Sequence, residues 1–298
     1  MSNILFEGIY SATFSLYDEN LNVKKDSVEK LIAYNEKNGV RGFYVGGNTG
    51  ECTTLPNRTR RQMAETVKAC AAPGSKVIIH VGAGHLEDVA DLVDHANSLG
   101  ADAVASLPPS LTAYYRAPEI IEYYRWLAAR SKAPVLAYVT PVLNCDLRWF
   151  GEQIMAIPNI IGLKVSIPNY YTFEQLKTIR DGDINILNGP DECMMAGLAM
   201  GADGAIGTTY NLMPATAVAV YDNFKAGRIG EARVHQHRMN RFIDVLLSVG
   251  GIAAWKSVLK VLDIDPGWTV APAAIPDDAQ YAAILARLKA NGSYDYIG

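Results

Sequence analysis

The sequence predicts an α/β fold, a (β/α)8 TIM barrel, followed by a C-terminal appendage of three helices. Short runs rich in β-branched residues alternate eight times with longer amphipathic segments, and repeated βα units form a parallel sheet covered by helices. The eight units occupy about 225 residues, close to the ~250 typical of such barrels. After residue 227 the strand pattern stops. We therefore expect a barrel with the active site over residues 1–227 and a helical region over residues 228–298.

The expected strands are short apolar runs bounded by turn-forming residues. In chain order they lie at residues 5–10, 42–46, 76–81, 102–107, 134–139, 160–165, 184–187 and 204–207. The expected helices show apolar side chains at a helical period. They lie at residues 24–38, 57–71, 86–99, 118–131, 146–156, 171–180, 192–200 and 214–226, with 231–248, 252–262 and 278–290 after the barrel. Gly39, Gly100 and Gly201 follow helices and tolerate the left-handed conformation that ends them. A doubly wound open sheet is the alternative, but it usually has fewer strands.

The composition excludes several classes of function. The chain has 298 residues, of which 49% are hydrophobic and 19% charged, as in a globular protein with a large core. A net charge of -4 gives no electrostatic footprint for nucleic acid or an anionic membrane. The four cysteines are widely spaced, so a disulfide framework or zinc site is not expected. The N-terminus has neither a basic segment nor a long apolar one, which favours a cytoplasmic protein.

Lys164 is the most informative residue, because it lies within the apolar run 160–165. A charged amine is costly in an apolar interior, and a neutral lysine amine can attack a ketone and form a Schiff base. Two alternatives remain open at this point. Lys164 either ends the strand and reaches water, or pairs with a carboxylate.

The active site of such a barrel lies at the carboxyl ends of its strands, so the residues there are candidates. The second strand leads into Gly46-Gly47-Asn48-Thr49-Gly50-Glu51, where backbone N–H groups, Asn48 and Thr49 can cradle a carboxylate or phosphate. An ordinary glycine-rich turn is the alternative. Tyr138 ends the fifth strand, either as a proton relay or as a packed aromatic.

The seventh and eighth strands also end in polar loops. Asp191 and Glu192 follow the seventh strand, and their alternative role is to cap a helix. The loop of residues 207–211 can bind hydroxyl groups. No Walker-type loop, nucleophile elbow or His-Glu-x-x-His pattern is present, so a metal site is not expected. His80 is interpreted as a satisfied core histidine.

In order and spacing, these segments resemble the dihydrodipicolinate synthase / N-acetylneuraminate lyase family, and the lyase branch most closely. The motifs that carry the resemblance span essentially the whole chain: Gly46-Gly47-Asn48-Thr49-Gly50-Glu51, Tyr138 with Pro141, Gly162-Leu163-Lys164, Gly189-Pro190-Asp191-Glu192 and Gly207-Thr208-Thr209-Tyr210-Asn211. The resemblance implies a homotetrameric barrel and a class I aldolase mechanism. Pyruvate would form a Schiff base on the strand-six lysine, without a metal or organic cofactor.

The resemblance also implies a role for each matched residue. Lys164 would be the Schiff-base lysine and Tyr138 the proton relay, while Asn48 and Thr49 would hold the pyruvate carboxylate. Ser166 would touch the acceptor portion of the substrate. The residues matched to the hydroxyl-binding part of the lyase branch are Gly189, Asp191, Glu192 and Thr208.

The chain departs from the family pattern in four places. The family's Tyr-Asn-x-Pro is Tyr138-Val139-Thr140-Pro141 here. Asn48 stands where the family usually has a hydroxyl residue. The segment after Pro141 lacks the arginine with which the synthase branch binds a second carboxylate, and the first arginine is Arg148. The loop of residues 108–115 displaces the tyrosine that the family shares between subunits.

We therefore expect an enzyme that cleaves N-acetylneuraminate or a related 2-keto-3-deoxy sugar acid to pyruvate and an aldose. One alternative is another pyruvate-dependent aldolase of the family, either a keto-deoxy sugar acid aldolase or dihydrodipicolinate synthase. The other is a sugar-acid-binding protein that kept the barrel and lost turnover, which Asn48 and the strand-four loop motivate. In each case the expected partners are small keto acids or sugar acids and further copies of the chain.

Overall fold

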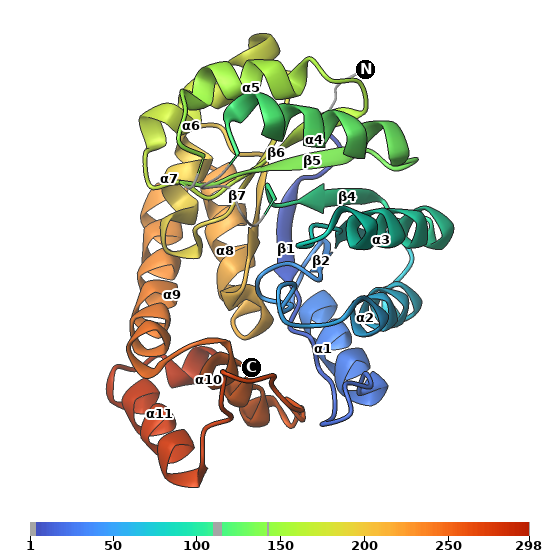
Figure 1. Ribbon diagram of the computed structural model, residues 1–298. Helices are drawn as coiled ribbons and strands as arrows, with labels where there is room; N and C mark the ends of the chain where they lie inside the picture. Colours follow the sequence, from blue (N-terminus) through green and yellow to red (C-terminus); the bar gives the residue numbers. More distant parts are fainter. Residues whose placement is uncertain (1–3, 110–114, 142, 298) are drawn as a thin grey trace.

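The computed structural model describes residues 4–109, 115–141 and 143–297. Within these residues, eight parallel strands close into a barrel, because β1 pairs with β8 as well as with β2 (Figure 1). The predicted (β/α)8 barrel is confirmed. The strands are β1 (Gly8–Ala12), β2 (Gly42–Val45), β3 (Lys76–His80), β4 (Ala103–Ser106), β5 (Val135–Val139), β6 (Ile160–Val165), β7 (Asn185–Asn188) and β8 (Gly204–Gly207).

The helices of the barrel cover the outside of the strands, as Figure 1 shows. A large apolar cluster lies between the strands and these helices, and a smaller one that includes Tyr44, Leu136 and Ile206 fills the barrel interior. Alternate residues of each strand therefore face these two layers. The helices are α1 (Lys25–Lys37), α2 (Asn57–Cys70), α3 (Leu86–Leu99), α4 (Ala117–Arg130), α5 (Leu147–Met155), α6 (Tyr170–Lys177), α7 (Met194–Ala199) and α8 (Pro214–Lys225).

The C-terminal region consists of α9 (Ile229–Val249), α10 (Ile252–Ser257) and α11 (Asp278–Ala290). In Figure 1 these helices, drawn orange to red, run from α8 past one end of the barrel. The segment after α10 contacts α1, because Lys30 Nζ donates to the Asp263 carbonyl. Among the described helices, none combines the length and apolar composition that a membrane span requires.

Four predicted elements differ most from the structure, and the ends of most others shift by one or two residues. The first strand begins at Gly8 rather than residue 5, because the backbone N–H groups of Leu5 and Phe6 donate to Asn185 Oδ1 instead of to a neighbouring strand. The helix predicted at 171–180 ends at Lys177, since the left-handed φ of 53° at Arg180 cannot continue it. The segments 192–200 and 252–262 each divide into a 3₁₀ turn and an α-helix. These turns are η3 (Asp191–Cys193) before α7 and η5 (Val258–Leu262) after α10.

Candidate active site

Lys164 lies in β6 with its amine between two tyrosine rings. Its Nζ is 4.6 Å from the ring centroid of Tyr44 and 4.6 Å from that of Tyr138. The residue is only 8% exposed, and none of the ion pairs among the described residues includes it. The alternative of a lysine paired with a carboxylate is therefore wrong, and only a small part of the residue reaches water.

The pairing of β5 with β6 brings Tyr138 beside Lys164. Val135 pairs with Ile160, but the register then shifts, so that Leu136 pairs with Gly162 and Tyr138 with Lys164. A one-residue irregularity in a strand changes which side chains share a face. The shift therefore places the tyrosine and the lysine on the same face of the barrel.

The Tyr138 hydroxyl forms a hydrogen bond with Ser166, 3.0 Å from its Oγ. Tyr138 is buried, and its backbone N–H donates to the Tyr124 hydroxyl, which fixes the end of β5. A Cβ at Gly189 would lie 1.8 Å from Ser166 Oγ, so the absence of a side chain at 189 leaves room for the serine. Tyr138, Ser166 and Gly189 thus form one side of the candidate site.

The glycine-rich loop after β2 places its two polar side chains differently. Thr49 is buried, and its Oγ1 lies 2.6 Å from Thr208 Oγ1 in the loop after β8. Asn48 is exposed, and its Oδ1 accepts a hydrogen bond from Cys52 Sγ at 3.4 Å. The structure therefore joins Thr49 to Thr208 and turns the Asn48 amide oxygen toward its own loop.

Asp191 and Glu192 are neighbours with different surroundings. Asp191 is buried, and its Oδ2 accepts a 2.7 Å hydrogen bond from the Thr209 backbone N–H at the start of another 3₁₀ turn, η4 (Thr209–Asn211). Burial raises the pKa of Asp191 to about 6, and hydrogen bonds from Thr209 oppose that rise. Its own turn, η3, has no side-chain cap, so Asp191 does not cap the helical segment that it begins but accepts the first N–H of η4 instead. Glu192 is exposed.

Sequence reasoning missed Tyr44, whose ring lies as close to the Lys164 amine as the ring of Tyr138 does. The signal was present in β2, because Tyr44 lies one position from the outward-facing Phe43 and Val45. Strand alternation alone would have placed its ring inside the barrel. The interpretation of His80 is confirmed. It is buried, its Nδ1 lies 3.0 Å from the Gly46 carbonyl, and its Nε2 accepts a hydrogen bond from the Leu107 N–H.

Burial lowers the pKa of His80 far below its usual value. The imidazole is therefore neutral and has a partner at each nitrogen, so it holds the loops after β2 and β4 together. Within the part of the chain that the structure describes, no three His, Cys, Asp or Glu residues gather as metal ligands would. The loop of residues 108–115, where the chain departs from the family pattern, lies mostly outside the described residues, since positions 110–114 are not among them.

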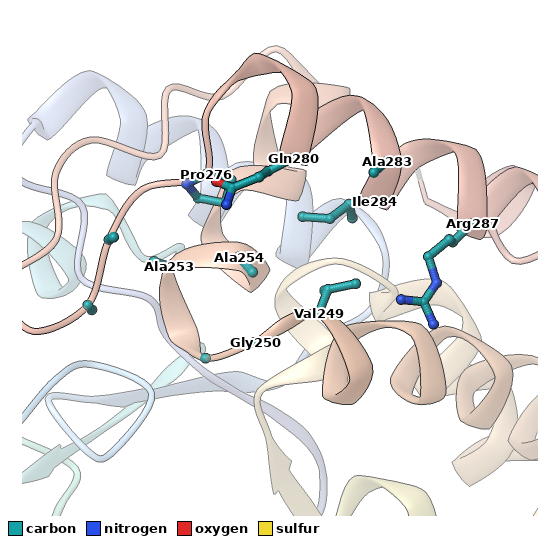
Figure 2. Close-up of a pocket in the computed structure, with 12 residues that line it drawn as sticks. Val249, Gly250, Ala253, Ala254, Pro276, Gln280, Ala283, Ile284 and Arg287 are labelled. Atoms are coloured by element: carbon teal, nitrogen blue, oxygen red, sulfur yellow. The ribbon is translucent and has the colours of Figure 1, made fainter.

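A separate cavity of about 400 Å³ lies in the C-terminal region (Figure 2). Its lining comes from the end of α9, from α10 and from α11, and it is mostly aliphatic, with Gln280 and Arg287 as polar side chains. None of the predicted site residues lines it. The candidate active site is therefore the group of side chains at the carboxyl ends of the barrel strands and not this cavity.

Comparison with known proteins agrees with the fold and covers almost the whole chain. Residues 5–290 match the model of the dihydrodipicolinate synthetase family. The chain is 34% identical over 280 residues to an N-acetylneuraminate lyase of Rhizobium meliloti, covering 93% of each chain. It is 31% identical over 293 residues to an N-acetylneuraminate lyase of Mediterraneibacter gnavus, covering 95% of this chain and 92% of the other.

Solved structures give the same result. N-acetylneuraminate lyase of Proteus mirabilis superposes with a TM-score of 0.89 at 28% identity, covering 96% of this chain and 98% of the other. The enzyme of Aliivibrio salmonicida superposes with a TM-score of 0.91 at 25% identity, covering 98% and 99%. With the barrel, the strand-six lysine and these matches taken together, the chain belongs to the dihydrodipicolinate synthetase family.

Proposed function

We propose that this protein is a pyruvate-dependent carbon–carbon lyase, a class I aldolase that cleaves N-acetylneuraminate or a related 2-keto-3-deoxy sugar acid. The observation that carries the proposal is the buried amine of Lys164, which lies between Tyr44 and Tyr138 where the strands of the barrel end. An amine in this setting suits imine formation with a ketone. The relatives named N-acetylneuraminate lyase support the substrate class.

The reaction follows from the positions of these groups. The Lys164 amine adds to the C2 ketone, and loss of water with uptake of one proton gives the protonated imine. Tyr138 then removes the proton from the C4 hydroxyl, the C3–C4 bond breaks, and its electron pair moves toward the imine nitrogen to give an enamine and an aldehyde. Protonation at C3 and hydrolysis of the imine release pyruvate and restore the free lysine. Ser166, hydrogen-bonded to Tyr138, extends the path by which the proton is returned.

The two ends of the substrate would bind on different loops. Thr49, with Asn48 and the backbone N–H groups of their loop, would hold the carboxylate beside the ketone. Gly189, Asp191, Glu192 and Thr208 would bind the hydroxyl-bearing tail. Asp191→Ala should therefore raise KM for a long sugar acid and leave imine formation with pyruvate alone unchanged.

A panel assay of pyruvate release tests the proposal. The substrates are N-acetylneuraminate and shorter 2-keto-3-deoxy sugar acids, and the reverse arm offers pyruvate with aspartate semialdehyde. We expect cleavage of a sugar acid and little condensation with aspartate semialdehyde, because the segment between Pro141 and Arg148 has no arginine for a second carboxylate. A preference for aspartate semialdehyde would show that the chain belongs to the synthase branch. Binding of sugar acids without turnover would show a binding protein.

We further propose that the enzyme is a cytoplasmic homotetramer that needs no metal or organic cofactor. Large apolar side chains are exposed in the single chain, including Leu86, Tyr171 and Leu247, which favours their burial between copies. Light scattering should give a mass four times the 32.4 kDa of one chain. A mass of one chain at micromolar concentration would contradict the tetramer, and loss of activity on dialysis against a chelator would contradict the absence of a metal.

A further inference from the structure

A buried ion pair joins the C-terminal helical region to the loop that follows β2. Lys256, in α10, has its Nζ 3.0 Å from Glu51 Oε1, and it donates a second hydrogen bond to the Trp268 carbonyl at 2.7 Å. The other carboxylate oxygen of Glu51 accepts a 2.5 Å hydrogen bond from the Tyr17 hydroxyl. Lys256 is 1% exposed and Glu51 is 6% exposed. Both side chains are thus almost completely buried. The Lys256 amine and both carboxylate oxygens of Glu51 have hydrogen-bond partners within the protein.

Enclosure of two charges carries a desolvation cost that their attraction offsets only when the geometry is good. The net stability that such a pair provides is therefore small or even negative, whereas removal of one partner leaves an uncompensated buried charge. A buried pair fixes the relative position of the elements that carry it. Here those elements are the loop after β2 and a helix that lies 205 positions later in the chain.

Glu51 is the residue that closes this loop. Its φ is 59°, a left-handed value that is uncommon for a residue other than glycine. Its backbone N–H donates to the Asn48 carbonyl, and the next N–H, that of Cys52, donates to the Gly47 carbonyl. The Ser15 hydroxyl holds the Gly50 carbonyl from outside the loop at 2.9 Å. Because the loop closes on itself, a movement of Glu51 is transmitted to residues 47–50.

Thr49 lies two positions before Glu51 in the same loop. Its side chain contacts Thr208. Thr208 is itself fixed, because its backbone carbonyl accepts a hydrogen bond from Asn211 Nδ2, and the same amide group also donates to the Ala12 carbonyl. The Thr49–Thr208 contact thus joins two loops. The loop after β8 is held by Asn211, and the loop after β2 is held by Glu51.

We propose that Glu51 and Lys256 are positioning residues of the active site. Through the Glu51 carboxylate, the C-terminal region holds the loop of residues 46–51 so that Thr49 remains beside Thr208. The identity of the ligand at Thr49, the pyruvate carboxylate, rests on the proposed function, whereas the position of the loop does not.

The test compares Lys256→Met with Lys24→Met. Lys24 pairs with Asp265 and joins the start of the chain to the same C-terminal segment, but that pair is exposed and does not touch the loop. Two measurements are made on each purified full-length variant below its melting temperature. One is the pyruvate concentration that gives half-maximal borohydride trapping on Lys164, and the other is hydrogen exchange at the backbone amides of residues 47–52.

We expect Lys256→Met to raise the half-saturating pyruvate concentration about 10-fold or more, with the same trapping at saturation, because a misplaced binding group costs affinity before it costs chemistry. Amide exchange in the loop should be faster in this variant, and Lys24→Met should match the wild type in both measurements. If Lys256→Met lowers only the melting temperature and leaves trapping and loop exchange unchanged, the pair is a stabilising contact and the inference is wrong.

If Lys256→Met does not fold, a variant with a smaller change can be measured in its place. Tyr17→Phe removes only the hydroxyl that holds Glu51 Oε2, and it should shift both measurements in the same direction by a smaller factor. An unchanged loop in a folded Tyr17→Phe protein, together with unchanged trapping, would also overturn the inference. If pyruvate modifies no variant and not even the wild type, the proposed function fails, and loop exchange alone then decides the positioning role.

Discussion

The hydroxyl of Tyr138 lies 3.0 Å from Ser166 Oγ, and this contact links the ends of β5 and β6 on the face that carries Lys164. Two hydroxyl groups in direct contact can pass a proton between them. A buried tyrosine that only fills space also needs a hydrogen-bond partner for its hydroxyl. Substitution separates the two roles, because only a proton-transfer role predicts a large loss of kcat.

Tyr138→Phe should lower kcat by roughly 10²–10⁴-fold and change KM much less, because the hydroxyl is needed mainly in the transition state. Steady-state kinetics with a keto-deoxy sugar acid measure this split. Tyr281→Phe is the control, since Tyr281 lies in α11, which carries none of the predicted site residues. A near-normal kcat for Tyr138→Phe would return this tyrosine to the packed-aromatic interpretation.

Pyruvate with borohydride should add a reduced three-carbon adduct to Lys164, since a buried amine without an ion-pair partner is the one available for imine formation. Peptide mass spectrometry locates the adduct. Lys177 and Lys256 serve as internal controls, because both are buried or half-buried but held by Asp203 and Glu51. Labelling that persists in Lys164→Ala at the wild-type level would contradict the assignment.

Gly189→Ala should lower kcat roughly 10–100-fold, because the new Cβ would displace Ser166 and with it the partner of Tyr138. The overpacked variant should also lose about 1–3 kcal/mol of unfolding free energy. Gly230→Ala is the matched control. Gly230 is a helical glycine in α9 with no heavy atom within 4 Å of an added Cβ, so activity should be unchanged and stability should change by less than about 1 kcal/mol. Equal kinetics for the two variants would show that Ser166 tolerates displacement.

Asp191 should make the unfolding free energy depend on pH. Its pKa is raised from 3.8 to about 6 in the folded protein, mainly because burial disfavours the charged form. A raised folded pKa means that the folded state binds the proton more tightly, so the stabilising contribution is complete below pH 3.8 and is lost as the pH rises through 6.

Urea unfolding of wild type and Asp191→Asn between pH 4 and pH 7 measures this contribution. The wild type should lose about 2 kcal/mol relative to the variant over that range, because each pKa unit is worth about 1.4 kcal/mol and part of the full contribution is already lost at pH 4. Subtracting the unfolding free energy of the variant from that of the wild type at each pH removes the contribution of the other carboxylates. A difference between the two proteins that stays constant with pH would contradict the raised pKa.

The fold followed from local sequence patterns because each βα unit carries its own signal. β6 and β8 begin and end at the predicted residues, and Lys164 was identified from the apolar run around it. The helix predicted at 171–180 was too long, because apolar periodicity does not report the left-handed backbone at Arg180. Local patterns thus predicted the order and type of the helices and strands, but they did not determine where some of them end.

The polar contacts of the site could not be predicted in the same way. Asp191 bonds to the Thr209 backbone once β7 pairs with β8, and Thr49 meets Thr208 only when β8 closes the barrel against β1. Sequence spacing gave Asp191 a capping role because the nearest backbone N–H groups are its own. Tertiary packing decides which distant N–H group donates to the Asp191 carboxylate. The sequence around Asp191 carries no signal for that packing. The family resemblance supplied the candidates but not these contacts.

The pairing of Glu51 with Lys256 also bears on synthesis of the chain. Glu51 leaves the ribosome first, and its partner follows 205 residues later, which at about 5–20 residues per second takes roughly 10–40 s. During that interval the carboxylate has no lysine to meet, and the strands around it can pair only partly, because β8 is also still to come. The corner of the barrel that holds Thr49 is therefore assembled last. A prematurely terminated chain that ends after β8 would contain every predicted catalytic and binding residue and still lack the support for that corner.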